Sequence, residues 1–81
     1  MKLRVKLFAV ARQRIGRDEI EVELPASATV GRLRSALVEQ HPPLADVLRV
    51  ARLAVDSDYA TDATVLDSAS EIALIPPVSG G

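Results

Sequence analysis

The chain has no cysteine, and this absence excludes three kinds of site. Without a thiol there is no disulfide scaffold, no cysteine-ligated zinc and no catalytic thiolate. The single histidine, His41, excludes a multi-histidine metal centre, and we expect no metal site. His41 stands just before Pro42 at the predicted end of a helix, so we interpret it as a cap of that helix.

Aromatic residues are nearly as scarce, since Phe8 and Tyr59 are the only two. Binding of single-stranded nucleic acid needs several aromatic rings for base stacking. A formal charge of −1 also provides no excess of positive charge to bind a phosphate backbone, so we expect no nucleic-acid partner. No apolar run approaches the ~20 residues that span a bilayer. Charge at every second position of the opening segment is not typical of a signal peptide. We therefore expect no membrane association and a cytoplasmic location.

The composition is that of one small globular domain. Of the 81 residues, 48% are hydrophobic and 26% are charged. Folding of such a chain buries roughly 60% of its unfolded surface, which supports one core but no deep active-site cleft. The sequence contains neither a glycine-rich phosphate loop nor carboxylates spaced as an acid/base pair. If the chain takes part in a reaction, little of the catalytic machinery is its own.

Two segments near the N-terminus alternate between apolar and charged residues. Residues 2–9 place Leu3, Val5 and Leu7 on one face, opposite a basic face. Residues 18–24 alternate in the same way, and their outer face is acidic. Opposite charges across an antiparallel pair are stabilising, so we predict that these strands pair. The basic residues 11–17 between them predict a helical turn or a wide loop.

The rest of the chain predicts one main helix followed by short strands. Thr29 is a good N-cap for residues 30–41, whose apolar residues have helical spacing, and Pro42 ends the helix. A short helical turn over 44–50, strands over 53–55 and 71–75, and a turn at 56–58 complete the pattern. This order predicts an α+β fold of the β-grasp (ubiquitin-like) type, with a mixed sheet packed on one main helix. Chain order alone also permits another small α+β roll.

The near-zero net charge hides an uneven distribution. Residues 1–17 contain no acidic side chain. Residues 53–81 contain no basic one, and their carboxylates are Asp56, Asp58, Asp62, Asp67 and Glu71. Each residue alone is explained as part of a solvated face. For the segment as a whole we favour docking on a basic partner, because complementary charge speeds encounter.

The chain end carries the most specific signal. We divide the chain into a β-grasp domain over 1–75 and an extended tail over 76–81. Pro76 and Pro77 hold the backbone extended after the last strand. Gly80 and Gly81 have no side chains, so they can enter a narrow channel and present a terminal carboxylate. This geometry suits an enzyme that activates a protein carboxylate.

These segments resemble the MoaD family, the small subunits of molybdopterin synthase, which are ubiquitin-like sulfur carriers. The residues that carry the resemblance are 71–81, which end in Pro-Pro-Val-Ser-Gly-Gly, with support from residues 5–9 and 29–33. The resemblance covers the whole chain. It departs from the family pattern at Asp56, where Asn is frequent, and at Ser68-Ala69-Ser70, where Asp-Gly-Asp is frequent. Both departures concern turn geometry.

The resemblance implies a sulfurtransferase function in which this chain supplies the sulfur. An ATP-dependent enzyme would adenylate Gly81 and then convert it to a thiocarboxylate. The large subunit of the synthase would hold the catalytic pocket, in which sulfur passes to cyclic pyranopterin monophosphate in molybdenum cofactor biosynthesis. Two small subunits are expected at the ends of a heterotetramer. The resemblance implies no permanently bound cofactor, because ATP acts only in the transient glycyl adenylate.

The same resemblance implies which residues contact the partner. These are the tail and its root, namely Ile75, Pro76, Pro77, Val78, Ser79 and Gly80. From the alternation we add Phe8, a large aromatic on the polar face of the first strand, which we predict to pack against the large subunit. The alternative for Phe8 is that the basic loop after the strand folds over it.

Three other functions remain open at this point. The chain could be a related carrier that feeds thiazole synthesis or tRNA thiolation. It could be a ubiquitin-like modifier that joins its C-terminus to lysines. It could also be a β-grasp interaction module whose tail has no function. Copurification of a larger partner, with or without sulfur on the tail, separates these possibilities.

Overall fold

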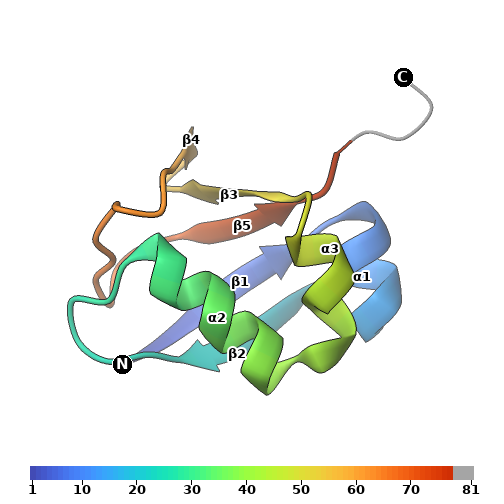
Figure 1. The fold of residues 1–81 in the computed structure, drawn as a ribbon, viewed down its shortest axis with the longest axis horizontal. Coiled ribbons are helices and arrows are strands. Elements are labelled where there is room, and N and C mark those ends of the chain that lie inside the picture. The colour runs from blue at the N-terminus through green and yellow to red at the C-terminus, as the bar shows by residue number, and fades with distance from the viewer. Residues whose placement is uncertain (78–81) are drawn as a thin grey trace.

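The computed structural model describes residues 1–77 and contains one mixed sheet with helices on one side and at one end (Figure 1). In chain order the elements are β1 (Lys2–Leu7), α1 (Ala9–Ile15), β2 (Glu19–Glu23), α2 (Val30–Gln40), the 3₁₀ helix η1 (Pro42–Leu44), α3 (Ala45–Leu48), β3 (Arg52–Val55), β4 (Asp58–Tyr59) and β5 (Ile72–Ile75). The predicted β-grasp arrangement is confirmed, with α2 as the main helix across the sheet.

The sheet has the order β2-β1-β5-β3-β4. β1 pairs antiparallel with β2, and the ladder sets Lys2 opposite Glu23 and Lys6 opposite Glu19. The predicted pairing of a basic with an acidic strand is therefore confirmed. β1 is parallel to β5, and β3 is antiparallel to both β4 and β5. Because β5 lies centrally between β1 and β3, the tail leaves from the middle of the sheet.

The core lies between the sheet and α2. The alternating residues of β1 and β2 are buried, as are the apolar residues that α2 presents at helical spacing: Val30, Leu33, Ala36 and Leu37. Burial of a large aliphatic side chain contributes roughly 1.5–3 kcal/mol, so this alternation also fixes the strand register. Within residues 1–77 no polar or charged side chain is buried.

The first strand is shorter than its alternation predicts. We expected a strand over 2–9, but β1 ends at Leu7, and α1 begins at Ala9. Of the two structures predicted for the basic segment, helix is the one that forms. It ends at Gly16, whose φ of 78° is the left-handed conformation that glycine adopts most readily, and the Gly16 amide donates to the Arg12 carbonyl at 2.7 Å.

The positions that depart from the family pattern have local explanations. Asp56 and Ser57 both have positive φ, of 51° and 72°, which is the two-residue turn that suits a β-hairpin. Asp56 Oδ1 also accepts a hydrogen bond from the Glu71 amide at 2.9 Å. Ala69 does not have positive φ, and its amide donates to Asp67 Oδ1 at 2.8 Å. Alanine therefore fits this turn without strain.

Thr29 and the loop before β5 supply the hydrogen-bond acceptors for the first turn of α2. Thr29 Oγ1 accepts from the Arg32 amide at 3.3 Å, which confirms the predicted N-cap. The Val30 and Gly31 amides donate to the carbonyls of Thr64 and Asp62. A Cβ at position 31 would lie 3.4 Å from the Asp62 backbone oxygen, which is van der Waals contact, so the loop packs directly on this turn. The free amides of the first helical turn thus find partners.

The chain passes from β1 into α1 through a residue in a strained backbone conformation. Ala9 is exposed and has a φ of 51°, a conformation that costs an L-residue about 1–2 kcal/mol. We predict that Ala9→Gly raises the free energy of unfolding by about 1 kcal/mol, since glycine relieves more strain than it adds chain entropy. Thermal unfolding should show a midpoint several degrees higher. Ala11→Gly is the control. Ala11 is buried within the same helix, so glycine at this position should destabilise the protein. A lower midpoint for Ala9→Gly would contradict the strain.

Candidate functional site

The root of the tail lies at the end of β5. Pro76 follows the strand and is buried, whereas Pro77 is exposed. Proline at these positions removes two backbone donors and fixes φ, so the sheet does not continue there. The predicted contact residues Val78, Ser79, Gly80 and Gly81 lie outside the described residues. The site that can be built is therefore the surface around this root.

One side of the root is an open groove of about 720 Å³. Its walls come from α1, α3 and the two prolines, and the apolar side chains that line it include Val10, Val50 and Pro77. Val50 is 64% exposed, although valine is a residue that proteins usually bury. The groove therefore offers an apolar surface directly beside the residue at which the described chain ends.

An ion pair crosses the polar part of this groove. Arg14 Nη1 of α1 donates to Asp46 Oδ1 of α3 at 2.8 Å. This hydrogen bond, more than the charge attraction, holds the pKa of the Asp46 carboxyl below its ordinary value. The carboxylate consequently stays charged at a lower pH than an isolated aspartate. The pair joins two helices that the apolar lining alone would hold less specifically.

The other side of the root is the outer face of the sheet. We call the apolar residues there the sheet patch; they are Phe8, Ala54, Tyr59, Ala73 and Ile75. β-Strand pairing sets Ala54 opposite both Ala73 and Tyr59. Leu7 is level with Leu74, and the extended backbone of Phe8 continues this register, which brings Phe8 level with Ile75. The patch thus spans four strands on the face that α2 does not cover.

The aromatic members of the sheet patch are the most accessible. Phe8 is 48% exposed, so the basic segment that follows it leaves about half of the side chain accessible. Tyr59 is 61% exposed, and its ring lies 4.5 Å from the Arg52 guanidinium carbon, a cation–π contact. Large exposed aromatic side chains grouped on one face indicate a protein-binding surface.

Sequence reasoning located part of this site. It singled out Phe8 and Ile75, which share the sheet patch, and Pro76 and Pro77, which line the groove. It counted Tyr59 among the two aromatic residues but missed its place beside Ala54. It also missed Val10 and Val50. A cross-strand register for β3 and β4 could have found Tyr59, but nothing in the sequence marks Val50 as exposed.

Two further classes of site find no support in residues 1–77. No group of three or more histidine or acidic residues there could hold a metal ion. None of the helices in this part of the chain has the length and hydropathy to cross a bilayer.

The β-grasp fold defines a ubiquitin-like domain, with exposed surfaces around the root of its C-terminal segment. The chain belongs to the ThiS family, whose model matches residues 5–81. It is 40% identical over 83 aligned residues to a protein from Caenorhabditis briggsae named molybdopterin synthase sulfur carrier subunit. That alignment covers 100% of this chain and 99% of the relative.

Two solved structures have the same fold over the full chain. SAMP1 (small archaeal modifier protein 1) from Haloferax volcanii is 31% identical with a TM-score of 0.85, and the match covers 100% of both chains. A chain from Helicobacter pylori 26695 is 23% identical with a TM-score of 0.70, again over 100% of both chains. Its structure is a protein–protein complex of subunits 1 and 2 of the molybdopterin-converting factor.

The two prolines allow a test of tail stiffness. We predict that Pro77→Gly weakens binding of the partner about two- to fivefold, because glycine adds conformations that binding must remove. Pro77 is exposed, so the unfolding midpoint should not change. Titration calorimetry and thermal unfolding measure the two quantities.

Pro43→Gly is the matched control, because Pro43 is exposed in η1 and does not line the groove. It should lower stability slightly and leave binding unchanged. Equal affinities for wild type and Pro77→Gly would count against a stiffness role.

Proposed function

We propose that this chain is the sulfur-carrier small subunit of a molybdopterin synthase, and that Gly81 carries the sulfur. The single observation that supports this most strongly is the full-length match to a curated sulfur carrier subunit at 40% identity, which includes the tail. The fold contributes a central strand that delivers the tail between two exposed surfaces. The sequence has no carboxylates spaced as an acid/base pair, and we infer that the catalytic pocket belongs to the large subunit.

The proposed chemistry starts from the terminal carboxylate of Gly81. A carboxylate is a poor electrophile, so an adenylating enzyme first uses ATP to form the glycyl adenylate and releases pyrophosphate. A hydrosulfide equivalent then attacks the carbonyl carbon. The new C–S bond forms, the C–O bond to AMP breaks, and one proton is released. The product is a thiocarboxylate, whose sulfur is a strong nucleophile toward the pterin precursor.

The absence of cysteine fits this chemistry. The only sulfur atom of the chain is the thioether of Met1, which cannot be passed on in this way. Sulfur must therefore ride on a group that is created after translation, and the terminal carboxylate is suited to that role. We expect the reaction in the cytoplasm, where ATP is available, and we expect two copies of this chain per heterotetramer.

The experiment that tests the function is reconstitution. The chain is incubated with the adenylating enzyme, ATP and a sulfide donor, and its C-terminal peptide is then weighed by mass spectrometry. The expected result is the replacement of one oxygen by one sulfur in that peptide. Addition of the large subunit and the cyclic pterin precursor should then restore the carboxylate as molybdopterin forms. A tail that never acquires sulfur would overturn the proposal.

A second candidate function is favoured by one observation, the 31% identity to the archaeal modifier protein. A modifier shares the adenylation step, but its acceptor is a lysine amine. Nucleophilic attack by that amine would release AMP and leave an isopeptide bond at Gly81. The same reconstitution without a sulfur donor distinguishes the two functions, because only a modifier would become attached to lysines of other proteins.

A further inference from the structure

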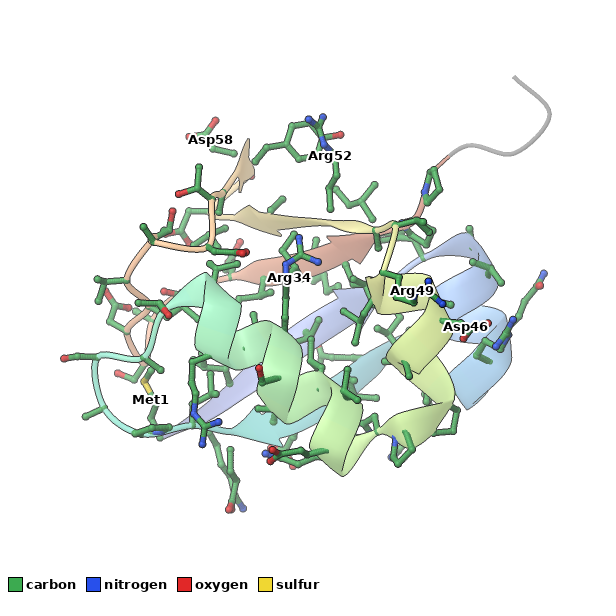
Figure 2. The ribbon with its side chains drawn as sticks, viewed as in Figure 1. Met1, Arg34, Asp46, Arg49, Arg52 and Asp58 are labelled. Atoms are coloured by element: carbon green, nitrogen blue, oxygen red, sulfur yellow. The ribbon has the colours of Figure 1, made fainter. Side chains whose placement is uncertain are left out.

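Charge is separated along the length of the sheet. Arginines gather at the end from which the tail leaves, on α1, on α3 and at the start of β3. We call Arg12, Arg14, Arg17, Arg49 and Arg52 the arginine collar. Figure 2 places Arg49 on the side of the sheet where the tail leaves and Asp58 at the other end. Arg52 is level with Ile75, one residue before the tail root.

Ion pairing neutralises the collar only in part. Arg14 is paired with Asp46, and Arg12 lies 3.5 Å from Asp18. Glu19 also lies at this end, but it is opposite Lys6 in the ladder and 3.8 Å from Arg4. Arg17, Arg49 and Arg52 form no ion pair within residues 1–77, and all three are exposed. Positive charge is therefore in excess around the root.

The carboxylates of the C-terminal third lie at the far end of the sheet. Asp56 lies in the β3–β4 turn, Asp58 follows that turn, and Glu71 precedes β5. Asp62 lies beside the start of α2, where Arg34 pairs with it at 3.2 Å. At about 3.3 Å per residue, the backbone of β3 carries the chain about 13 Å from the tail end of the sheet at Arg52 to Asp56, although the Arg52 guanidinium itself stacks on Tyr59 of β4. That distance exceeds the Debye length of about 8 Å in physiological salt, so a partner senses each end separately.

The carboxylates of Asp56, Asp58, Asp62 and Glu71 are thus remote from the tail root. A partner that receives the tail meets the arginine collar first. We propose, on the basis of the function proposed above, that the arginine collar fits an acidic rim around the channel through which the large subunit receives the tail. Attraction at the collar and repulsion at the acidic end turn the carrier so that its tail approaches first. Such steering raises the association rate more than it raises affinity.

The complementary charges also suit the cargo. The carboxylate or thiocarboxylate of Gly81 is negative, and so is the phosphate-bearing substrate. A pocket that binds both must be positive inside. An acidic rim outside such a pocket would attract the collar while leaving the interior free to attract the chain end. The root of the tail is therefore surrounded by positive charge, whereas its tip is negative. The rim and the interior of the pocket would each attract the part of opposite charge.

The test compares two variants with the same change in net charge at opposite ends. Arg49→Glu reverses a charge in the collar, whereas Arg32→Glu reverses one in the first turn of α2, close to Asp62. Both side chains are exposed. Stopped-flow association of each full-length chain with the large subunit is measured at about 20 mM and about 300 mM salt, where screening differs strongly. Arg17→Glu serves as a second collar variant should Arg49→Glu fold poorly.

We expect the wild-type association rate to fall as salt rises. At low salt Arg49→Glu should associate about five- to tenfold more slowly, with a weaker salt dependence, whereas Arg32→Glu should match or exceed the wild-type rate. Three results would refute the proposed role of the arginine collar. They are a wild-type association rate that does not depend on salt, a wild-type rate that rises with salt, and equal slowing by both variants.

Association is measured without sulfur on the tail, which separates the two proposals. Salt-sensitive binding by a chain that never becomes thiocarboxylated would refute the function and support the collar. Sulfur transfer with salt-independent association would refute the collar and leave the function standing. Absence of any binding to the large subunit would refute both.

Discussion

Deletion of Gly81 should abolish sulfuration of the pterin precursor while leaving the domain folded. No other group in the chain can hold the sulfur, because there is no cysteine and the single methionine is a thioether. The core of the domain is formed by residues up to Leu74, so the unfolding midpoint should match that of wild type. The sheet patch and the groove are also untouched, and much of the affinity for the large subunit should remain.

The measurement combines single-turnover pterin sulfuration with mass spectrometry of the tail and a binding titration. Gly80→Val is a companion variant that keeps the terminal carboxylate. Its Cβ would meet the walls of a channel shaped for glycine, so it should slow transfer without removing the carrier group. A deletion variant that still supports transfer would show that sulfur does not ride on Gly81.

Phe8→Ala should weaken the complex with the large subunit at least tenfold, which corresponds to about 1.4 kcal/mol or more. Phe8 is one of the two exposed aromatic side chains of the sheet patch and lies level with Ile75 at the root of the tail. A half-exposed ring contributes little to the fold, so the free energy of unfolding should fall by about 1 kcal/mol or less. Calorimetric titration and thermal unfolding check these two expectations.

Val38→Ala is the matched control for Phe8→Ala. Val38 is 40% exposed on α2, which covers the opposite face of the sheet. Its truncation removes partly exposed apolar surface of the same kind, so stability should change by a similar small amount, but binding should be unaffected. A large loss of stability with normal affinity for Phe8→Ala would instead place Phe8 in the core beneath α1.

Much of the fold was predictable because its signals are local or periodic. Alternation in β1 and β2 determined which residues are buried, and their opposite charges predicted the pairing. Thr29 and Pro42 marked the two ends of α2 by capping chemistry and by the missing amide of proline. The boundary between β1 and α1 escaped this reasoning. Ala9 adopts a left-handed conformation there that alanine does not favour, so propensity could not indicate it.

The sequence alone led to the proposed chemistry, because it contains no cysteine and its residues 71–81 resemble the MoaD family, in which the terminal carboxylate is the group that is activated. Only the tertiary structure decided which surfaces accompany that tail. Tyr59 reaches the sheet patch through the pairing of β3 with β4, and Val50 reaches the groove because α3 packs beside α1 and Pro76. The acidic third lies far from the tail root although it directly precedes it in the chain. The reason is that the end of β3 lies beside the start of β5, so the carboxylates near both are at one end of the sheet, and the extended β5 then carries the chain to the tail root at the other end.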